Sequence, residues 1–240
     1  MPVFTITGDI DPFVHVALVK GEKIYCESDA MVMMEANLEL KGKMTGGIGS
    51  AIMRRFANGE SLFQQHIEAV HGDGDCLLSP TLPGAVRLID VGTRQYLLSD
   101  GAFVAATSGT EMKTRMQSIG NALFAQSGGF FVMETAGTGQ VAVSGFGAMF
   151  ELDVEPGKEV IIDNSHVICW DSALQYKISV TTRGGNGLGG LIGNMINSAT
   201  SGEGIVLRFS GRGKVLVCSR NRDAFVAWMQ KEVAGKRSGR

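Results

Sequence analysis

The stretch whose spacing most resembles a ligand-binding motif is Gly137-Thr138-Gly139-Gln140-Val141-Ala142. It matches the Gly-x-Gly-x-x-Ala fingerprint, in which glycines let the backbone approach a pyrophosphate at the start of a helix. Here alternating apolar residues continue on both sides, as in strands. Related Gly-x-Gly turns at 72–74 and 211–213 lack the rest of the fingerprint. We therefore interpret all three as tight turns of β-hairpins and expect no cofactor.

The histidines are the residues best suited to bind a metal. They are His15, His66, His71 and His166. Strand-borne metal sites commonly use a His-x-His pair, because alternate residues face the same side of a strand. This sequence contains no such pair. We expect ordinary surface or core histidines, and a metal site assembled from distant strands is the alternative.

Nucleophilic catalysis would need an activated cysteine or serine. Cys26, Cys76, Cys169 and Cys218 lie far apart in apolar segments, with no Cys-x-x-Cys pair. This pattern predicts buried reduced thiols and no structural zinc site. Residues 47–51 read Gly-Ile-Gly-Ser-Ala, which lacks the final glycine of the nucleophile-elbow motif. We therefore expect that the protein is not an enzyme.

Two connectors, 46–56 and 184–196, are rich in glycine yet carry many apolar side chains. Apolar loop tips indicate burial, contact with a fellow subunit or protein partner, contact with a membrane surface, or ligand binding. Two arginines beside a phenylalanine in the first connector would suit an anionic lipid surface. The candidate interaction residues are Ile48, Ile52, Met53, Arg54, Arg55, Phe56, Leu188, Leu191, Ile192 and Met195.

Basic residues also gather near the third Gly-x-Gly turn. They are Arg208, Arg212, Lys214, Arg220 and Arg222. No aromatic stacking platform accompanies them, the other two turns lack such a set, and the formal net charge is −2. The sequence therefore argues against nucleic-acid binding.

The elements that would position these residues are short apolar strands. Glycine is unusually frequent, at 33 of 240 residues, and charged residues make up only 19%. Similar cycles of strands, connector and Gly-x-Gly turn occupy about 1–80, 81–146 and 147–219, which predicts an internal triplication within one domain, 1–240. The predicted fold is all-β: three tandem antiparallel repeats forming a sandwich or double-stranded β-helix-like body.

The end of the chain differs from the repeats. Residues 220–234 place Phe225, Trp228 and Met229 at i, i+3 and i+4, the spacing of an amphipathic helix. We expect this helix to cap an open end of the β-body or to form a subunit contact. The N-terminus lacks a signal peptide and no run of about 18 apolar residues occurs, so we expect a cytoplasmic protein without a membrane-spanning helix.

Several diffuse features resemble a known family. They are the Gly-Gly connector, the Gly-Glu-Ser-Leu-Phe segment at 59–63, the Gly-x-Gly turns and the tail Arg-Asn-Arg-Asp-Ala-Phe at 220–225. Across essentially the whole chain they resemble bacterial members of the altered-inheritance-of-mitochondria protein family, member twenty-four. The resemblance implies a fold similar to the tryptophan RNA-binding attenuator protein, usually oligomeric. It implies no established enzymatic activity and carries over no catalytic or ligand residues; mitochondrial members are linked to inner-membrane organisation.

These observations favour a non-enzymatic oligomeric scaffold or binding protein, and a membrane surface is one candidate place for it to act. We expect the chain to assemble with itself, as a trimer or a hexamer. The alternative is an enzyme or small-ligand binder whose site forms between repeats, and RNA binding is a third interpretation.

Overall fold

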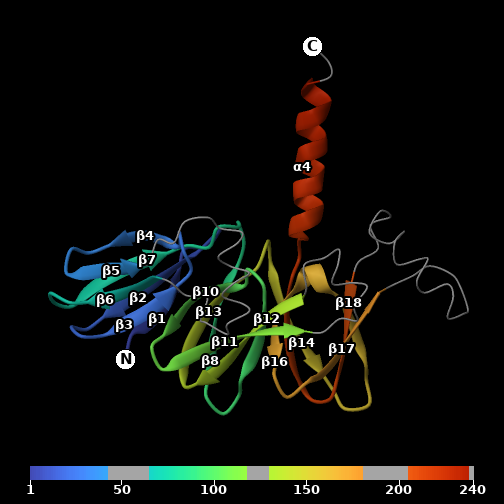
Figure 1. The fold of residues 1–240 in the computed structure, drawn as a ribbon, viewed down its shortest axis with the longest axis horizontal. Helices are drawn as coiled ribbons and strands as arrows, with labels where there is room; N and C mark the ends of the chain where they lie inside the picture. The colour runs from blue at the N-terminus through green and yellow to red at the C-terminus, as the bar shows by residue number, and fades with distance from the viewer. Residues whose placement is uncertain (43–64, 118–129, 181–204, 238–240) are drawn as a thin grey trace, which may run out of the picture.

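The computed structural model describes residues 1–42, 65–117, 130–180 and 205–237, where the chain is almost entirely β (Figure 1). The predicted all-β class and the C-terminal helix are confirmed. In chain order, the strands of the described residues are β1 (Val3–Thr7), β2 (Phe13–Leu18), β3 (Lys23–Cys26), β4 (Met31–Met34), β5 (Leu38–Gly42), β6 (Gln65–Ala69), β7 (Gly74–Leu78), β8 (Val86–Val91), β9 (Tyr96–Ser99), β10 (Phe103–Thr107), β11 (Thr110–Gln117), β12 (Phe130–Gly137), β13 (Gly139–Ser144), β14 (Met149–Val154), β15 (Val160–Asp163), β16 (Val167–Asp171), β17 (Gln175–Val180), β18 (Ile205–Ser210) and β19 (Gly213–Cys218). A short 3₁₀ helix, η1, covers Asn164–His166, and helix α4 covers Arg222–Arg237.

The strands form four antiparallel sheets. Their strand orders are β1-β2-β7-β4, β5-β6-β3-β10-β13-β8, β11-β12-β9-β16-β19-β14 and β15-β18-β17. Alternating apolar residues explain which face a strand buries: in β2, Val14, Val16 and Leu18 are buried, and the residues between them are half-buried.

The three Gly-x-Gly turns do not close hairpins, so that prediction is wrong. The strands on either side of each turn, β6 and β7, β12 and β13, and β18 and β19, belong to different sheets. Each turn therefore carries the chain from one layer to the other. Gly137 and Gly139 have φ angles of +85° and +153°, and a Cβ on Gly139 would overlap with the hydroxyl of Thr107. This crossing needs glycine both for its backbone conformation and for its close approach.

The same strand order occurs three times along the chain. We call β2–β7 unit 1, β8–β13 unit 2 and β14–β19 unit 3. One layer of each unit is ordered β2-β7-β4, β8-β13-β10 or β14-β19-β16, and the other is β3-β6-β5, β9-β12-β11 or β15-β18-β17. The two six-stranded sheets join neighbouring units, because β3 pairs with β10 and β9 pairs with β16. The units run from left to right in Figure 1.

The core consists of three apolar clusters, each of which includes residues of two units. β10 and β16 are buried along their whole length, because each lies inside a six-stranded sheet at a joint between units. Trp170 of β16 is fully buried. Its ring lies 5.1 Å from that of Tyr176 and 5.6 Å from that of Phe209, an aromatic cluster that ties β16 to the opposite layer of unit 3.

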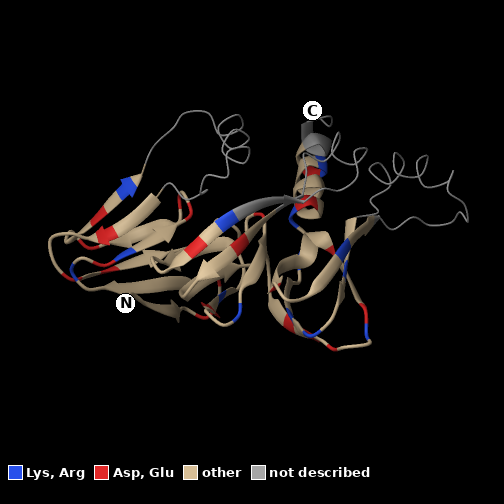
Figure 2. Cartoon of the chain, turned by 60° about the horizontal axis from the view of Figure 1, so that its bottom comes forward, with Lys and Arg blue, Asp and Glu red and all other residues tan. Residues whose placement is uncertain are grey.

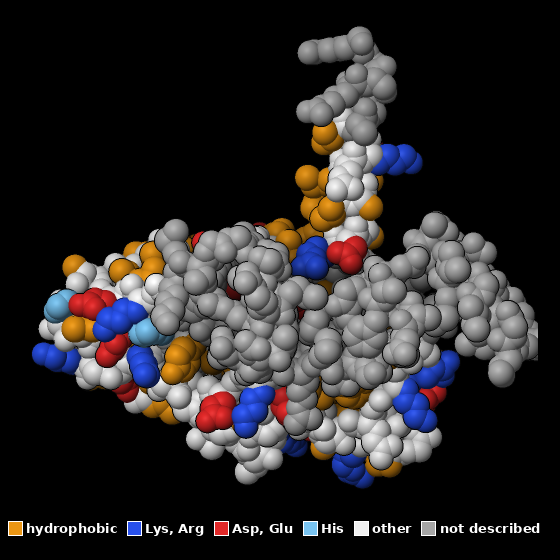
Figure 3. All heavy atoms as spheres, in the orientation of Figure 1, with side chains coloured by type: hydrophobic (Ala, Val, Ile, Leu, Met, Phe, Trp, Pro, Cys, Tyr) orange, Lys and Arg blue, Asp and Glu red, His pale blue; other side chains and the backbone are white. Residues whose placement is uncertain are grey.

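Helix α4 begins and ends two to three residues later than predicted. It stands away from the sheets (Figures 1 and 3), so the prediction that it caps an open end of the β-body is wrong. A subunit contact by this helix stays a prediction. Among the described residues, no helix combines the length and apolar character needed to cross a bilayer.

Candidate functional site

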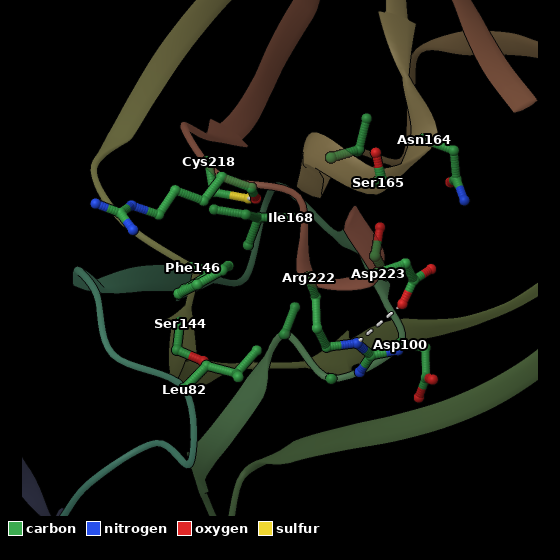
Figure 4. A pocket seen from close by; sticks show the side chains of 16 residues that line it. Leu82, Asp100, Ser144, Phe146, Asn164, Ser165, Ile168, Cys218, Arg222 and Asp223 are labelled. Atoms are coloured by element: carbon green, nitrogen blue, oxygen red, sulfur yellow. Dashed lines mark hydrogen bonds and ion pairs between the residues drawn. The ribbon is translucent and has the colours of Figure 1, made fainter. Parts of the chain in front are cut away.

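A pocket lies where units 2 and 3 meet at the foot of helix α4 (Figure 4). Its wall comes from the turn after β9, the ends of β13 and β19, helix η1 and the first residues of α4. Its volume is about 260 Å³, close to the lower end of the range for small-molecule sites. The pocket therefore lies between two units, but none of the four histidines lines it.

Two oxygens in the wall of this pocket are buried and lack a hydrogen-bond partner in the described part of the chain. They are Ser99 Oγ and Asn164 Oδ1. Burying a polar group without a partner costs on the order of 1–3 kcal/mol. Buried polar groups are paired in most native proteins, so an exception needs an explanation. Both atoms expose less than 1 Å², so the pocket wall would have to shift before a hydroxyl or amine group of a ligand could pair with them.

The mouth of the pocket carries charges of both signs. The Nε atom of Arg222 lies 3.5 Å from a carboxylate oxygen of Asp223, and Figure 4 shows the Arg222 side chain extending toward Asp100. The guanidinium of Arg220 lies over the ring of Phe146, 5.7 Å from its centroid. This mixture of donors and acceptors suits a neutral or zwitterionic polar ligand.

The start of helix α4 is fixed to the rim of the pocket. Asn221 Oδ1 accepts a hydrogen bond of 2.9 Å from the N–H of Ala224, which caps the helix. Its Nδ2 donates to Ser165 Oγ at 2.7 Å. The ring of Phe225 packs edge-on against Phe146, with centroids 5.2 Å apart. The base of α4 is therefore positioned by the β-body, and the rest of the helix extends from it.

Beyond this base, helix α4 exposes a set of large apolar side chains. Exposed fractions are 45% for Val226, 57% for Trp228, 46% for Met229 and 55% for Val233. From Val226 to Val233 every side chain is exposed, and the space-filling view shows hydrophobic side chains along the protruding helix (Figure 3). An apolar set of this kind marks an interaction surface.

The histidines make ordinary polar contacts. His15 Nε2 lies 3.3 Å from an Asp75 carboxylate oxygen, and His71 Nε2 lies 2.9 Å from one of Glu39. His166 Nδ1 lies 2.8 Å from the backbone oxygen of Cys218. Among the described residues, no group of three His, Cys, Asp or Glu is arranged to hold a metal ion.

The cysteine thiols are held in their protonated form. Burial raises the pKa of the Cys26 thiol to about 11, and those of Cys76 and Cys169 to about 12. Burial also raises the pKa of Cys218, which is only half-buried. Because the thiolate is the reactive form, all four are weak nucleophiles near neutral pH.

The basic residues near the third turn are largely paired with carboxylates. Arg208 Nη1 lies 2.8 Å from Glu159, and Lys214 forms an ion pair with Glu151. Figure 2 shows Lys and Arg interspersed with Asp and Glu along the strands. Phosphate binding to Arg208 or Lys214 would therefore have to displace an existing ion pair.

The candidate loop residues named from the sequence, between Ile48 and Phe56 and between Leu188 and Met195, lie outside the described residues. The apolar spacing of the C-terminal helix was also visible in the sequence, and the structure shows its Trp228 and Met229 side chains exposed. Cys218, Arg220 and Arg222 of the pocket wall were named from the sequence for other reasons. Ser99 and Asn164 were missed, because they belong to no sequence motif.

The comparisons with known proteins agree over most of the chain. A profile of the family "Mitochondrial biogenesis AIM24" matches residues 4–220. An uncharacterised protein of Streptococcus pyogenes serotype M6 is 34% identical over 235 residues, which are 95% of this chain and 90% of the relative. A crystal structure of a Streptococcus pyogenes protein superposes with a TM-score of 0.78 at 31% identity, covering 97% of this chain and 100% of the other.

Proposed function

This chain belongs to the AIM24 family, and we propose that it is a non-enzymatic scaffold that binds anionic membrane surfaces through helix α4. The observation that carries the proposal is the exposure of the apolar side chains of α4, a helix whose contact with the described β-body is made at its base through Phe225. An isolated helix of about this length is marginal in water, because helices in proteins depend on packing of an apolar face. A partner that covers this face is therefore part of the working protein.

The composition of the helix favours lipid as this partner. Trp228 is a residue type enriched at membrane interfaces, and it projects with Met229 and Val233 from the exposed part of the helix. From 222 to 240 the sequence has five basic residues against two acidic ones. An amphipathic helix with an apolar set that includes Trp and an excess of Lys and Arg suits the surface of an anionic bilayer.

Tryptophan fluorescence tests this proposal directly, because the two tryptophans report on different places. Trp170 is fully buried and Trp228 is 57% exposed. Vesicles of phosphatidylcholine with about a third phosphatidylserine should shift the emission of Trp228 to shorter wavelength. The protein should also sediment together with these vesicles. Added salt should weaken binding, since part of the attraction is electrostatic.

Matched variants separate the helix from other apolar sites. Trp228→Ala combined with Met229→Ala should abolish co-sedimentation. Phe150→Ala removes another large exposed apolar residue, 64% exposed on β14, and should leave binding unchanged. Failure of the wild-type protein to sediment with anionic vesicles at low salt would overturn the proposal. A lipid-independent emission shift that grows with protein concentration would instead identify a second copy as the partner of α4.

The proposed lack of catalysis is supported by the protonated thiols and by the ordinary contacts of His15 and His71 with single carboxylates. We also propose that the scaffold is a homo-oligomer, a trimer or a hexamer. The resemblance to the tryptophan RNA-binding attenuator fold is part of this proposal and is supported by sheets that continue from one unit to the next. Light scattering on the purified protein tests the oligomer, and a monomeric mass would exclude it.

The second candidate function is binding of a small polar ligand in the junction pocket. It is favoured by the unpaired oxygens of Ser99 and Asn164 in the pocket wall. A thermal-shift screen with sugars, polyols and amino acids tests it. A stabilising compound whose effect is lost in Ser99→Ala would support binding there, whereas no stabilisation by any of these classes would argue against it.

A further inference from the structure

Neighbouring units of the chain are joined twice by the same strand contact. At the first joint, Ala105 of β10 lies opposite Cys26 of β3. At the second, Cys169 of β16 lies opposite Leu98 of β9. Both joints are antiparallel and contain three consecutive residue pairs. In both, the second strand of one unit (β3 or β9) meets the third strand of the next (β10 or β16).

Among the strands of the described residues, two make no such contact within the chain, because they lie at the two ends of its array of units. β4 corresponds to β10 and β16 but is the last strand of its sheet, and β15 corresponds to β3 and β9 but is also at a sheet end. β5, β11 and β17 end their sheets in every unit, so their position is a constant feature of the pattern. β4 and β15 are instead edge strands whose counterparts are internal.

A register shift common to β4, β10 and β16 defines the register that β4 would adopt against a strand of another unit. β4, β10 and β16 each shift register at the same point against the strand that follows the Gly-x-Gly turn. After the shift, Met33 pairs with Leu77, Ala105 pairs with Ala142, and Cys169 pairs with Leu216. Met33 therefore occupies the position of Ala105 and Cys169.

The register of β15 follows in the same way. Ile162 pairs with Leu207 of β18, and Leu98 pairs with Met133 of β12. Leu207 and Met133 both lie four residues before the first glycine of their turn, so Ile162 occupies the position that Leu98 has at the second joint. The spacing at the first joint differs, since Cys26 pairs with Gln65, seven residues before Gly72. Since Leu98 lies opposite Cys169 within the chain, the equivalent partner of Ile162 is Met33.

Burial differs sharply between the joined and the free strands. Most residues at the two joints are buried, and Ala106 and Leu98 are completely buried. On the free strands, Val32 is 54% exposed, Met33 41% and Ile161 50%. β4 and β15 therefore have the apolar composition of internal strands, although they lie at exposed edges. The unpaired N–H and C=O groups of an edge strand favour pairing with another strand.

We propose that β15 of one copy of this chain pairs antiparallel with β4 of the next, placing Met33 opposite Ile162 and Met34 opposite Ile161. The occupant of each edge is a second copy, because the contact continues the joint that already links the units within the chain. The contact is heterologous, so repetition closes a ring or extends a filament. This inference rests on the proposed self-association and is independent of lipid binding by α4.

Disulfide cross-linking tests the register. In a Cys218→Ser background, Met33→Cys protein mixed with Ile162→Cys protein should form a covalent dimer under mild oxidation. Directly opposite residues of antiparallel strands have Cα separations of about 4.5–5.5 Å, within disulfide range. Neither variant alone should cross-link, because the edges are different surfaces. Met33→Cys mixed with Asp163→Cys is one residue out of register and serves as the matched control.

A charge on the edge tests the assembly itself. Ile161→Lys should lower the apparent association constant of the oligomer, measured by light scattering, at least tenfold. Phe150→Lys on the β14 edge should leave this constant unchanged. Circular dichroism confirms that each variant is folded, as expected for residues that are at least half exposed. A monomeric wild type at tens of micromolar, cross-linking of Met33→Cys alone, or equal cross-linking of the out-of-register pair would overturn the inference. Ile161→Lys should still bind anionic vesicles, which separates this test from that of helix α4.

Discussion

Glu27 provides the sharpest test of the electrostatics at the first joint between units. It directly follows β3, and its backbone N–H donates a hydrogen bond of 2.9 Å to the carbonyl of Val104 in β10. Burial raises the pKa of its carboxyl group from 4.5 to about 7, and the nearby charges of Asp100 and Asp29 add to the effect. The perturbation is Glu27→Gln, which keeps the shape and removes the ionisable group.

The raised pKa has a definite sign for stability. Below pH 4.5 Glu27 is protonated in both the folded and the unfolded chain, so it carries no penalty. As the pH rises from 4.5 to 7 the unfolded chain releases its proton first, and the folded state loses stability until Glu27 ionises as well. The shift corresponds to at most about 3 kcal/mol at about 1.4 kcal/mol per pKa unit. Partial hydration of this half-buried carboxyl reduces the expected value to about 1–2 kcal/mol.

The assay is denaturant unfolding of wild type and Glu27→Gln at pH 4.5 and pH 8. The variant should be about 1–2 kcal/mol more stable than wild type at pH 8 and nearly equal to it at pH 4.5. Glu232→Gln, an exposed substitution on α4, should change little at either pH. A stability difference for Glu27→Gln that is the same at both pH values, or larger at pH 4.5, would refute this account of the joint.

Two further predictions concern the turn and the thiols. Gly139→Ala should destabilise the fold by about 3 kcal/mol or more, because its Cβ would overlap with the Thr107 hydroxyl. The control Gly157→Ala, at φ +83° with open space around it, should cost only about 1 kcal/mol. Equal losses of stability in thermal or denaturant unfolding would contradict the steric argument. In the native protein at pH 8, a thiol reagent should modify Cys218 before the other three cysteines, because those three are buried, and even Cys218 should react slowly. Rapid labelling of Cys169, detected by mass spectrometry, would contradict this prediction.

Strand positions were predictable from the sequence, but the sheets to which they belong were not. Alternating apolar residues mark β2, for example, through Val14, Val16 and Leu18. The Gly-x-Gly turns, however, look the same whether they close a hairpin or cross between layers. The difference lies in pairings such as Ala106 with Tyr25, between residues far apart in the chain, which no local pattern encodes.

The candidate sites show the same division. The apolar spacing of Phe225, Trp228 and Met229 predicted the helix, since periodicity is a local property. Whether this face is covered depends on where the β-body ends, and Phe225 is the one of these three that packs against the described body, through Phe146. The junction pocket could not be predicted, because residues such as Asn164 are ordinary polar residues until the pairing of β9 with β16 brings units 2 and 3 together.

The apolar composition of β4 and β15 is unusual for strands at the edges of sheets. Edge strands usually carry charges or proline that discourage pairing, yet β4 reads Met-Val-Met-Met and β15 begins Val-Ile-Ile. Continuous apolar runs of this kind are typical of strands buried on both faces, as β10 and β16 are here. If β4 and β15 were permanent edges, these side chains would favour aggregation. Their composition is explained if each edge becomes an internal strand when copies of the chain assemble.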